Sequence, residues 1–337
     1  PECRAVRRDI GAYVRGRASG RSRSRVDRHV EHCDRCAALV ADAREMNSTI
    51  MLSIAGLLVP AAAVAALRDA PSWLPAAGVG VGAYMTWVEP VYLRPALAAA
   101  ATFLMCAAGN AMNDLTDIVG DRINHPERVL VTGALAPEFA RRLAIACAAA
   151  AAALGALAGL EVAALVLLAA ALLAAYNLHL KNLPVAGNLT VGVLGGMTFL
   201  AGGAAVDPTL AWILPGPLIP AVFAVLFHFV REILKDARDI AGDRAVGSCS
   251  LPLALGIRAS LTAALVLFAA LVVLTIVPVA AGWFGTLYKV ITVYVIDFPV
   301  LALLILVWGN PTARMLSIGS TALKAGMALG VVALLVA

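Results

Sequence analysis

The chain has 337 residues, of which 61% are hydrophobic and only 14% are charged, and its mean hydropathy is +0.88. A soluble domain carries about 25% charged residues, so this composition excludes an ordinary soluble protein. The formal charge of +5 comes mostly from the amino-terminal arginines and from polar loops. This pattern indicates positive-inside membrane topology rather than nucleic-acid binding.

Residues 1–45 are polar and rich in arginine, and the remainder is a series of apolar runs. Runs of roughly 20 apolar residues are long enough to cross a bilayer, and in lipid the backbone needs the internal hydrogen bonds of a helix. We therefore predict an all-α, polytopic membrane helix bundle, with long charged connections at 114–135 and 235–258. The apolar segments are 47–67, 74–92, 94–113, 136–158, 160–178, 185–205, 211–234, 259–280, 285–308 and 318–337.

The pattern D-x-x-D-x-x-x-D occurs twice in the chain, each time directly after an apolar run. On a helix, offsets of three and seven residues place all three carboxylates on one face. The two triads are Asp114, Asp117 and Asp121, and Asp236, Asp239 and Asp243.

Carboxylates stacked in this way repel one another, so each triad requires cations to offset its charge. Hard oxygen ligands suit Mg²⁺, which is usually shared with the phosphate groups of a substrate. Two triads that face each other would hold a diphosphate through bridging Mg²⁺, which acts as a Lewis acid toward the departing diphosphate. Solvated acidic helix ends are the simpler alternative, but ionisable groups at membrane depth are costly and usually functional.

Basic and amide side chains near the triads are candidates for binding substrate. Arginine offers bidentate contacts to phosphate oxygens, although each basic residue could instead be a topology-setting charge that reaches the membrane surface. Asn110 precedes Asp114 by four residues and is either a metal ligand or an interhelical hydrogen-bond donor. Glu232 precedes Asp236 in the same way, and either joins the second triad or pairs with Lys235. The basic candidates are Arg128, Lys181, Arg231 and Lys235.

Three segments resemble the UbiA superfamily of intramembrane prenyltransferases, within a likeness that covers about residues 68–337. They are GNAMNDLTDIVGDRINHPERVLVTG at 109–133, YNLHLKNLPVAGNLTVG at 176–192 and REILKDARDIAGDRAVGSCSLPLALG at 231–256. The third segment and the stretch at 187–205 most resemble the digeranylgeranylglyceryl phosphate synthase branch. The resemblance implies about nine transmembrane helices and two Mg²⁺ ions. It also implies transfer of a geranylgeranyl group from its diphosphate to geranylgeranylglyceryl phosphate, a step of ether-lipid synthesis.

The resemblance assigns roles residue by residue. Both aspartate triads match the catalytic metal motifs, and Asn110 belongs to the first of them. Tyr176 and Lys181 match the tyrosine and lysine of the family's middle loop. Arg128 matches the last arginine of the family pattern N-R-P-x-R-P-I-P-S-G.

The chain departs from the family pattern in that loop. His125 stands where the family usually has arginine, and residues 129–133 replace P-I-P-S-G. The family also has an R-x-x-N pattern near the start of its first helix. Arg44 and Asn47 match this pattern directly. Alignment of the glycine-rich run at 78–84 with the family's first helix instead places Arg68 at the arginine position.

The amino-terminal head contains the pattern C-x25-H-x3-C-x2-C, whose side chains are suited to one tetrahedral Zn²⁺. Its histidine and second cysteine are predicted one turn apart on a helix, with His32 as a competing ligand and a reduced, metal-free head as the alternative. Residues 2–45 resemble the zinc-binding domain of anti-sigma factors, which implies a sigma factor as partner. The ligand set is Cys3, His29, Cys33 and Cys36.

These patterns divide the chain into a zinc-binding head at 1–45, an extra or linking apolar helix at 46–67 and a prenyltransferase domain at 68–337. We expect a multi-pass protein of the plasma membrane, with its active site and head facing the cytoplasm. That arrangement requires an even number of crossings before the loop at 114–135, but three apolar segments precede it. Either the first or the second segment does not span fully, or the head lies outside.

The predicted enzyme is a Mg²⁺-dependent geranylgeranyltransferase that ionises a prenyl diphosphate and lets a lipid-like acceptor capture the allylic cation. Membrane lipid surrounds it, and no nucleic acid is expected as a partner. One alternative is a UbiA-type enzyme with an aromatic acceptor, as in quinone or chlorophyll pathways. A membrane-bound regulator acting through the zinc head is another. A transporter is the third, since intramembrane carboxylates also couple ion movement.

Overall fold

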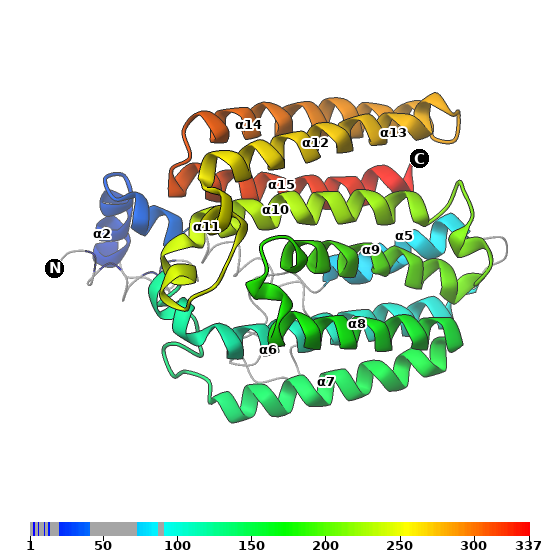
Figure 1. The fold of residues 1–337 in the computed structure, drawn as a ribbon, viewed down its shortest axis with the longest axis horizontal. Coiled ribbons are helices and arrows are strands. Elements are labelled where there is room, and N and C mark those ends of the chain that lie inside the picture. The colour runs from blue at the N-terminus through cyan, green and yellow to red at the C-terminus, as the bar shows by residue number, and fades with distance from the viewer. Residues whose placement is uncertain are drawn as a thin grey trace. The chain divides into compact units, whose positions relative to one another are not determined.

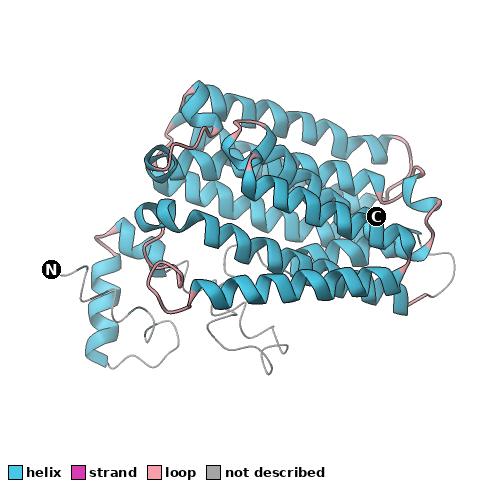
Figure 2. Ribbon diagram, turned by 60° about the horizontal axis from the view of Figure 1, so that its bottom comes forward, coloured by secondary structure: helices cyan, strands magenta, loops and turns pink. Residues whose placement is uncertain are grey.

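The structure is a computed structural model in which every regular element among the described residues is helical (Figure 2). The chain divides into two compact units, Pro1–Arg68 and Asp69–Ala337. The predicted all-α class is therefore confirmed, whereas the expected helix at 47–67, Arg44 and Arg68 lie outside the described residues. The residues that the structure describes are 20–40, 73–86 and 91–337, with the single positions Cys3, Val6, Ile10 and Tyr13.

The second unit is a bundle of long helices that lie alongside one another (Figure 1). Within the described residues, seven helices are long and apolar enough to cross a membrane. The first unit contributes α2 (Gly20–Val30). The second contains α5 (Trp73–Thr86), α6 (Leu93–Asn124), α7 (Pro137–Ala158), α8 (Leu160–Leu178), η2 (Leu180–Asn182), α9 (Ala186–Val206), η3 (Leu210–Trp212), α10 (Leu218–Ala245), α11 (Leu251–Leu255), α12 (Ile257–Ala280), α13 (Thr286–Lys289), the π-helical η4 (Val290–Asp297), α14 (Phe298–Gly309) and α15 (Ala313–Leu335).

Helix α9 is the most buried of the seven candidate spans, with 61% of its apolar window inside the protein. Its glycines let neighbouring backbones approach closely, as expected for helices that pack without a hydrophobic driving force. A Cβ on Gly202 would lie 1.9 Å from the carbonyl oxygen of Val79 on α5. A Cβ on Gly192 would lie 2.6 Å from that of Val225 on α10. This close packing holds α10, which carries the second aspartate triad, against α9.

Both aspartate triads lie within helices, so the connections expected at 114–135 and 235–258 are shorter than predicted. Helix α6 continues through the first triad and ends at Asn124, because the residue before Pro126 is pushed out of the helical region. Helix α10 begins only after the proline-containing turn and ends at Ala245. Gly247 follows with a φ of 70°, which glycine adopts without steric cost.

Two large apolar cores pack different sets of helices in the second unit. One packs the apolar faces of α5 to α9, and the other packs α10, α12, η4, α14 and α15. Inside the second core, Thr275 Oγ1 on α12 lies 2.7 Å from Asp297 Oδ2 at the end of η4. The first core thus includes α6 and the second includes α10, the two helices that carry the aspartates.

Candidate active site

The two aspartate triads lie at the same end of the bundle, on the carboxyl-terminal parts of α6 and α10 (Figure 1). Asn124 joins the two helices directly. Its Nδ2 donates to the backbone oxygen of Asp239 at 2.9 Å, and its Oδ1 accepts from the backbone N–H of Gly242 at 3.0 Å. The predicted convergence of the two triads is therefore found in the structure.

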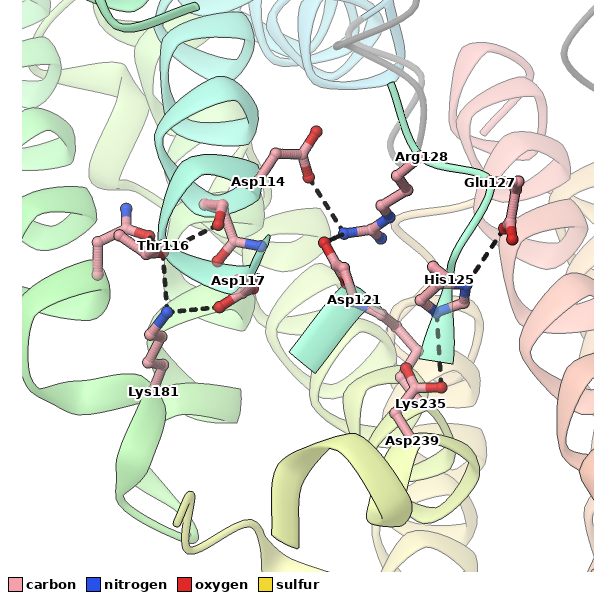
Figure 3. Close-up of polar contacts among 12 residues, drawn as sticks. Asp114, Thr116, Asp117, Asp121, His125, Glu127, Arg128, Lys181, Lys235 and Asp239 are labelled. Carbon is pink, nitrogen blue, oxygen red and sulfur yellow. Dashed lines mark hydrogen bonds and ion pairs between the residues drawn. The ribbon is translucent and has the colours of Figure 1, made fainter. Parts of the chain in front are cut away.

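Basic side chains from outside α6 contact the first triad (Figure 3). Arg128, in the loop after α6, places Nη1 3.2 Å from Asp114 Oδ1 and 2.6 Å from Asp121 Oδ2. Lys181 on η2 places Nζ 2.5 Å from Asp117 Oδ1. Burial lowers the pKa of Arg128 to about 10, so this guanidinium stays charged at neutral pH. Two of the predicted phosphate-binding cations thus reach the first triad.

Asp239 of the second triad is held by contacts from its own helix and from the loop after α6. Arg238 donates from Nε and Nη2 to the two carboxylate oxygens of Asp239, at 2.8 and 2.9 Å. His125 Nε2 lies 3.6 Å from Asp239 Oδ1. Burial opposes the charged form of His125, but its contacts with Asp239 and Glu127 raise its pKa to about 9. His125 therefore supplies a cation that links the loop after α6 to α10.

Glu232 pairs with basic neighbours on its own helix. Arg231 Nη1 lies 2.8 Å from Glu232 Oε1, and Lys235 Nζ lies 2.9 Å from Glu232 Oε2. Of the two interpretations of Glu232, the structure therefore supports pairing with Lys235. Asp236, the next carboxylate along α10, accepts a hydrogen bond from Asn188 Nδ2 at 3.0 Å.

Asn110 does not contact the triad in the described structure, because its Nδ2 donates to Cys106 Sγ on its own helix at 3.7 Å. Tyr176 lies on α8, one turn before the segment that carries Lys181. Sequence reasoning missed Asn113, whose Oδ1 is buried and has no hydrogen-bond partner among the described residues. Asn113 precedes Asp117 by four residues, so the spacing argument applied to Asn110 would have found it.

The donor set of this end of the bundle suits Mg²⁺. Six carboxylates on two joined helices are hard oxygen ligands, and the amide oxygen of Asn113 is a further unpartnered oxygen of the same kind. Asp121 is only 7% exposed, and a buried carboxylate needs a cation nearby. The aspartates of both triads, with Asn113, are the residues that would hold the ions.

The amino-terminal unit gathers the four predicted zinc ligands. Their ligand atoms all lie within 4.8 Å of one another. Cys3 Sγ is 3.9 Å from Cys33 Sγ and 3.3 Å from His29 Nε2. Zn–S bonds of about 2.3 Å place tetrahedral sulfurs about 3.8 Å apart, so the cluster fits Zn²⁺. A hydrogen bond from the backbone N–H of Cys36 lowers the pKa of Cys33, which favours the thiolate that zinc binds.

The helix expected to carry both His29 and Cys33 is interrupted, and that prediction is wrong. Helix α2 ends at Val30, and a second helical stretch begins at 34. The carbonyl oxygen of Cys33 accepts from the N–H of Cys36 and of Ala37, at 3.0 and 2.9 Å, so Cys33 begins the second stretch. The break still leaves the two ligands in one cluster.

Comparison with known families gives two matches. Residues 73–317 match the UbiA prenyltransferase family model, and residues 3–37 match a zinc-finger family model. A digeranylgeranylglyceryl phosphate synthase of Halobacterium salinarum is 40% identical over 200 residues, which cover 58% of this chain and 71% of that protein. The enzyme of the same name from Methanopyrus kandleri is 36% identical over 244 residues, which cover 72% and 85%.

Solved structures share the fold. A structure of digeranylgeranylglyceryl phosphate synthase in membranes has a TM-score of 0.64 and 27% identity, covering 82% of this chain and 96% of that one. An apo UbiA homologue from Aeropyrum pernix has a TM-score of 0.61 and 26% identity, covering 79% and 94%. A UbiA homologue from Archaeoglobus fulgidus bound to GPP and Mg²⁺ has a TM-score of 0.58 and 18% identity, covering 81% and 99%.

Asn113 and Asn110 provide a matched pair of variants that tests the metal site. We expect Asn113→Ala to raise the Mg²⁺ concentration needed for half-maximal binding of prenyl diphosphate by about 10- to 100-fold, because it removes an oxygen next to the first triad. Asn110→Ala should leave that Mg²⁺ concentration unchanged, since the Asn110 amide donates its hydrogen bond within α6. The measurement is a Mg²⁺ titration of prenyl diphosphate binding by calorimetry. Equal effects of the two variants would contradict the assignment.

Proposed function

Because this chain belongs to the UbiA prenyltransferase family, we propose that it transfers a geranylgeranyl group from geranylgeranyl diphosphate to the free hydroxyl of geranylgeranylglyceryl phosphate. The observation that carries the proposal is the convergence of two aspartate triads, joined through Asn124, at one end of a membrane helix bundle. The names of the archaeal relatives support the choice of acceptor.

The aspartates and the basic residues of the site have different roles in binding the substrate and stabilising the leaving group. The triads hold the divalent ions, and Mg²⁺ bound there supplies Lewis-acid stabilisation to the departing diphosphate. Arg128 and Lys181 contact the first triad from the adjoining loop and short helix. From there their N–H groups would donate to phosphate oxygens of the bound diphosphate. Fixed donors aimed at developing negative charge lower the barrier without reorganisation during the reaction.

The transfer step exchanges one bond for another at C1 of the prenyl group. The C1–O bond to the diphosphate breaks with its electron pair, and the acceptor oxygen bonds to C1. The acceptor releases its hydroxyl proton, so that the products are the diether lipid, diphosphate and H⁺. Apolar side chains of the helices exclude water from the allylic cation, which prevents hydrolysis.

Basic residues gather at the helix ends next to the triads, which supports a cytoplasmic active site in a plasma membrane protein. Examples are Arg122, Arg128, Lys181 and Arg244. Cys249 lies in the loop after α10 and is exposed. A membrane-impermeant thiol reagent should label Cys249 only from the cytoplasmic side of intact vesicles, as detected by peptide mass spectrometry. Labelling from the opposite side alone would show the reverse orientation.

The function is tested by identifying the product. Incubation with geranylgeranyl diphosphate, Mg²⁺ and geranylgeranylglyceryl phosphate should give the diether phosphate by mass spectrometry, and an aromatic acceptor should give no adduct. Asp117→Asn and Asp239→Asn should each lower kcat by at least about 100-fold, because each removes a charge that holds the ions. Glu138→Gln, exposed on α7, is the charge-loss control. Prenylation of the aromatic acceptor instead would overturn the proposed substrate.

The head is proposed to bind one Zn²⁺ through Cys3, His29, Cys33 and Cys36. Cys33→Ser should lower the zinc content of the purified chain from about one ion to near zero, because a structural zinc site needs all four ligands. Cys147→Ser, in α7, should leave the zinc content unchanged. Elemental analysis by mass spectrometry gives the result, and zinc-free wild-type protein would contradict the site.

A sigma factor as partner of the head rests on the resemblance to anti-sigma factors, and a fold does not carry its partner with it. Co-purification of the complete chain with a sigma factor from its own cells tests this proposal, with the zinc-deficient Cys33→Ser chain as the comparison. Recovery of the wild-type chain without any sigma factor would contradict it.

A further inference from the structure

The three charged residues Arg231, Glu232 and Lys235 form a cluster on α10 that the metal chemistry does not use. Both basic side chains bond the same carboxylate, Arg231 at 2.8 Å and Lys235 at 2.9 Å. Arg231 is only 8% exposed and Glu232 only 5%. Arg231 and Glu232 therefore lie inside the protein, next to the second triad, whereas Lys235 is partly exposed.

Arg231 keeps an unused hydrogen-bond donor. A guanidinium has five N–H donors, and its Nη1 donates to Glu232. Its Nε is buried and has no partner in the described part of the chain. An unpaired buried donor costs free energy, so this group is suited to a ligand that accepts hydrogen bonds.

The charge of the cluster points to the same kind of ligand. Arg231 shares its one carboxylate, Glu232, with Lys235, whereas Lys235 also lies within electrostatic range of Asp114, Asp236 and Asp243. A buried charge is costly unless it is paired. The nearest carboxylate along the helix, Asp236, belongs to the metal triad and accepts from Asn188. An anion that contacts Arg231, with Lys235 beside it, would satisfy the buried donor that Glu232 leaves free.

Arg231 lies deeper along α10 than the carboxylates of the second triad. Arg231 and Lys235 are four residues apart and share one face of α10. Arg231 precedes Asp236 by five residues, so its Cα lies about 7.5 Å farther from the loop end of the helix. An anion held by Arg231 would therefore sit deeper than the triad carboxylates, on the side of the apolar chains, with Lys235 at the level of Asp236.

We propose that Arg231 and Lys235 bind the phosphate group of the acceptor lipid, at a subsite distinct from the Mg²⁺-held diphosphate. This inference rests on the proposed function, whose acceptor has a phosphate on the carbon next to its free hydroxyl. Holding that phosphate places the hydroxyl between the cluster and the triads, where C1 of the prenyl donor lies. The subsite selects glyceryl phosphate lipids over phenols, which have no phosphate.

The test compares binding of geranylgeranylglyceryl phosphate with that of geranylgeranylglycerol, which lacks the phosphate. Both lipids are titrated into the detergent-solubilised chain with Mg²⁺ and prenyl diphosphate omitted, and tryptophan fluorescence reports binding. We expect Arg231→Gln and Lys235→Gln to weaken binding of the phosphate lipid by about 10- to 100-fold and to leave binding of the alcohol unchanged. Arg142→Gln, exposed on α7, is the matched control.

Equal losses for both lipids, or no loss for either, would overturn the subsite. Lys235 has a side chain that is 31% exposed, so Lys235→Gln keeps the test decisive if Arg231→Gln does not fold. In steady-state assays both variants should raise the KM of the acceptor and not that of geranylgeranyl diphosphate. The opposite split would assign these cations to the diphosphate and refute the proposal.

If wild-type protein makes no diether product, the proposed function fails. The binding comparison uses neither Mg²⁺ nor prenyl diphosphate, so it still decides the phosphate subsite by itself.

Discussion

Mutual repulsion of six carboxylates at one end of a membrane bundle is the constraint that the rest of the site satisfies. Charges so close together in a poorly solvated setting need cations within a few ångströms. Arg128 and Lys181 meet this need at the first triad, and Arg238 and His125 meet it at Asp239. Arg128, Lys181 and His125 come from loops or a short helix that the carboxylates thereby hold in place, whereas Arg238 lies beside Asp239 on α10.

The frame that keeps the triads together is built from small residues and one amide. Glycines of α9 let the backbones of α5 and α10 approach, which positions α10 without large side chains between the helices. Asn124 then fastens the end of α6 to the backbone of α10 between Asp239 and Gly242. A Cβ at Gly242 would lie 2.2 Å from the Asn124 side chain, so a larger residue here would displace the amide that joins the two helices.

The sequence predicted the elements whose signal is local. Apolar runs predict the spanning helices, and the repeated aspartate spacing predicts two carboxylate faces. Partnerships across the fold are not local: His125 and Asp239 meet although more than a hundred residues separate them, because α6 and α10 pack at their ends. The choice between Asn110 and Asn113 depends on which helix face turns inward, which spacing alone does not fix. The break after α2 was missed because no proline or glycine marks it.

Sharing of one pair of ions by both triads is the central claim, and a double-mutant cycle tests it most directly. Affinity for geranylgeranyl diphosphate in Mg²⁺ is measured by calorimetry for Asp121→Asn, Asp243→Asn and the double variant. If both triads hold the same ions, either substitution removes most of the Mg²⁺-dependent affinity and the double variant binds no more weakly than the singles. Strictly additive losses in binding free energy would show that the triads act independently, and would contradict the account.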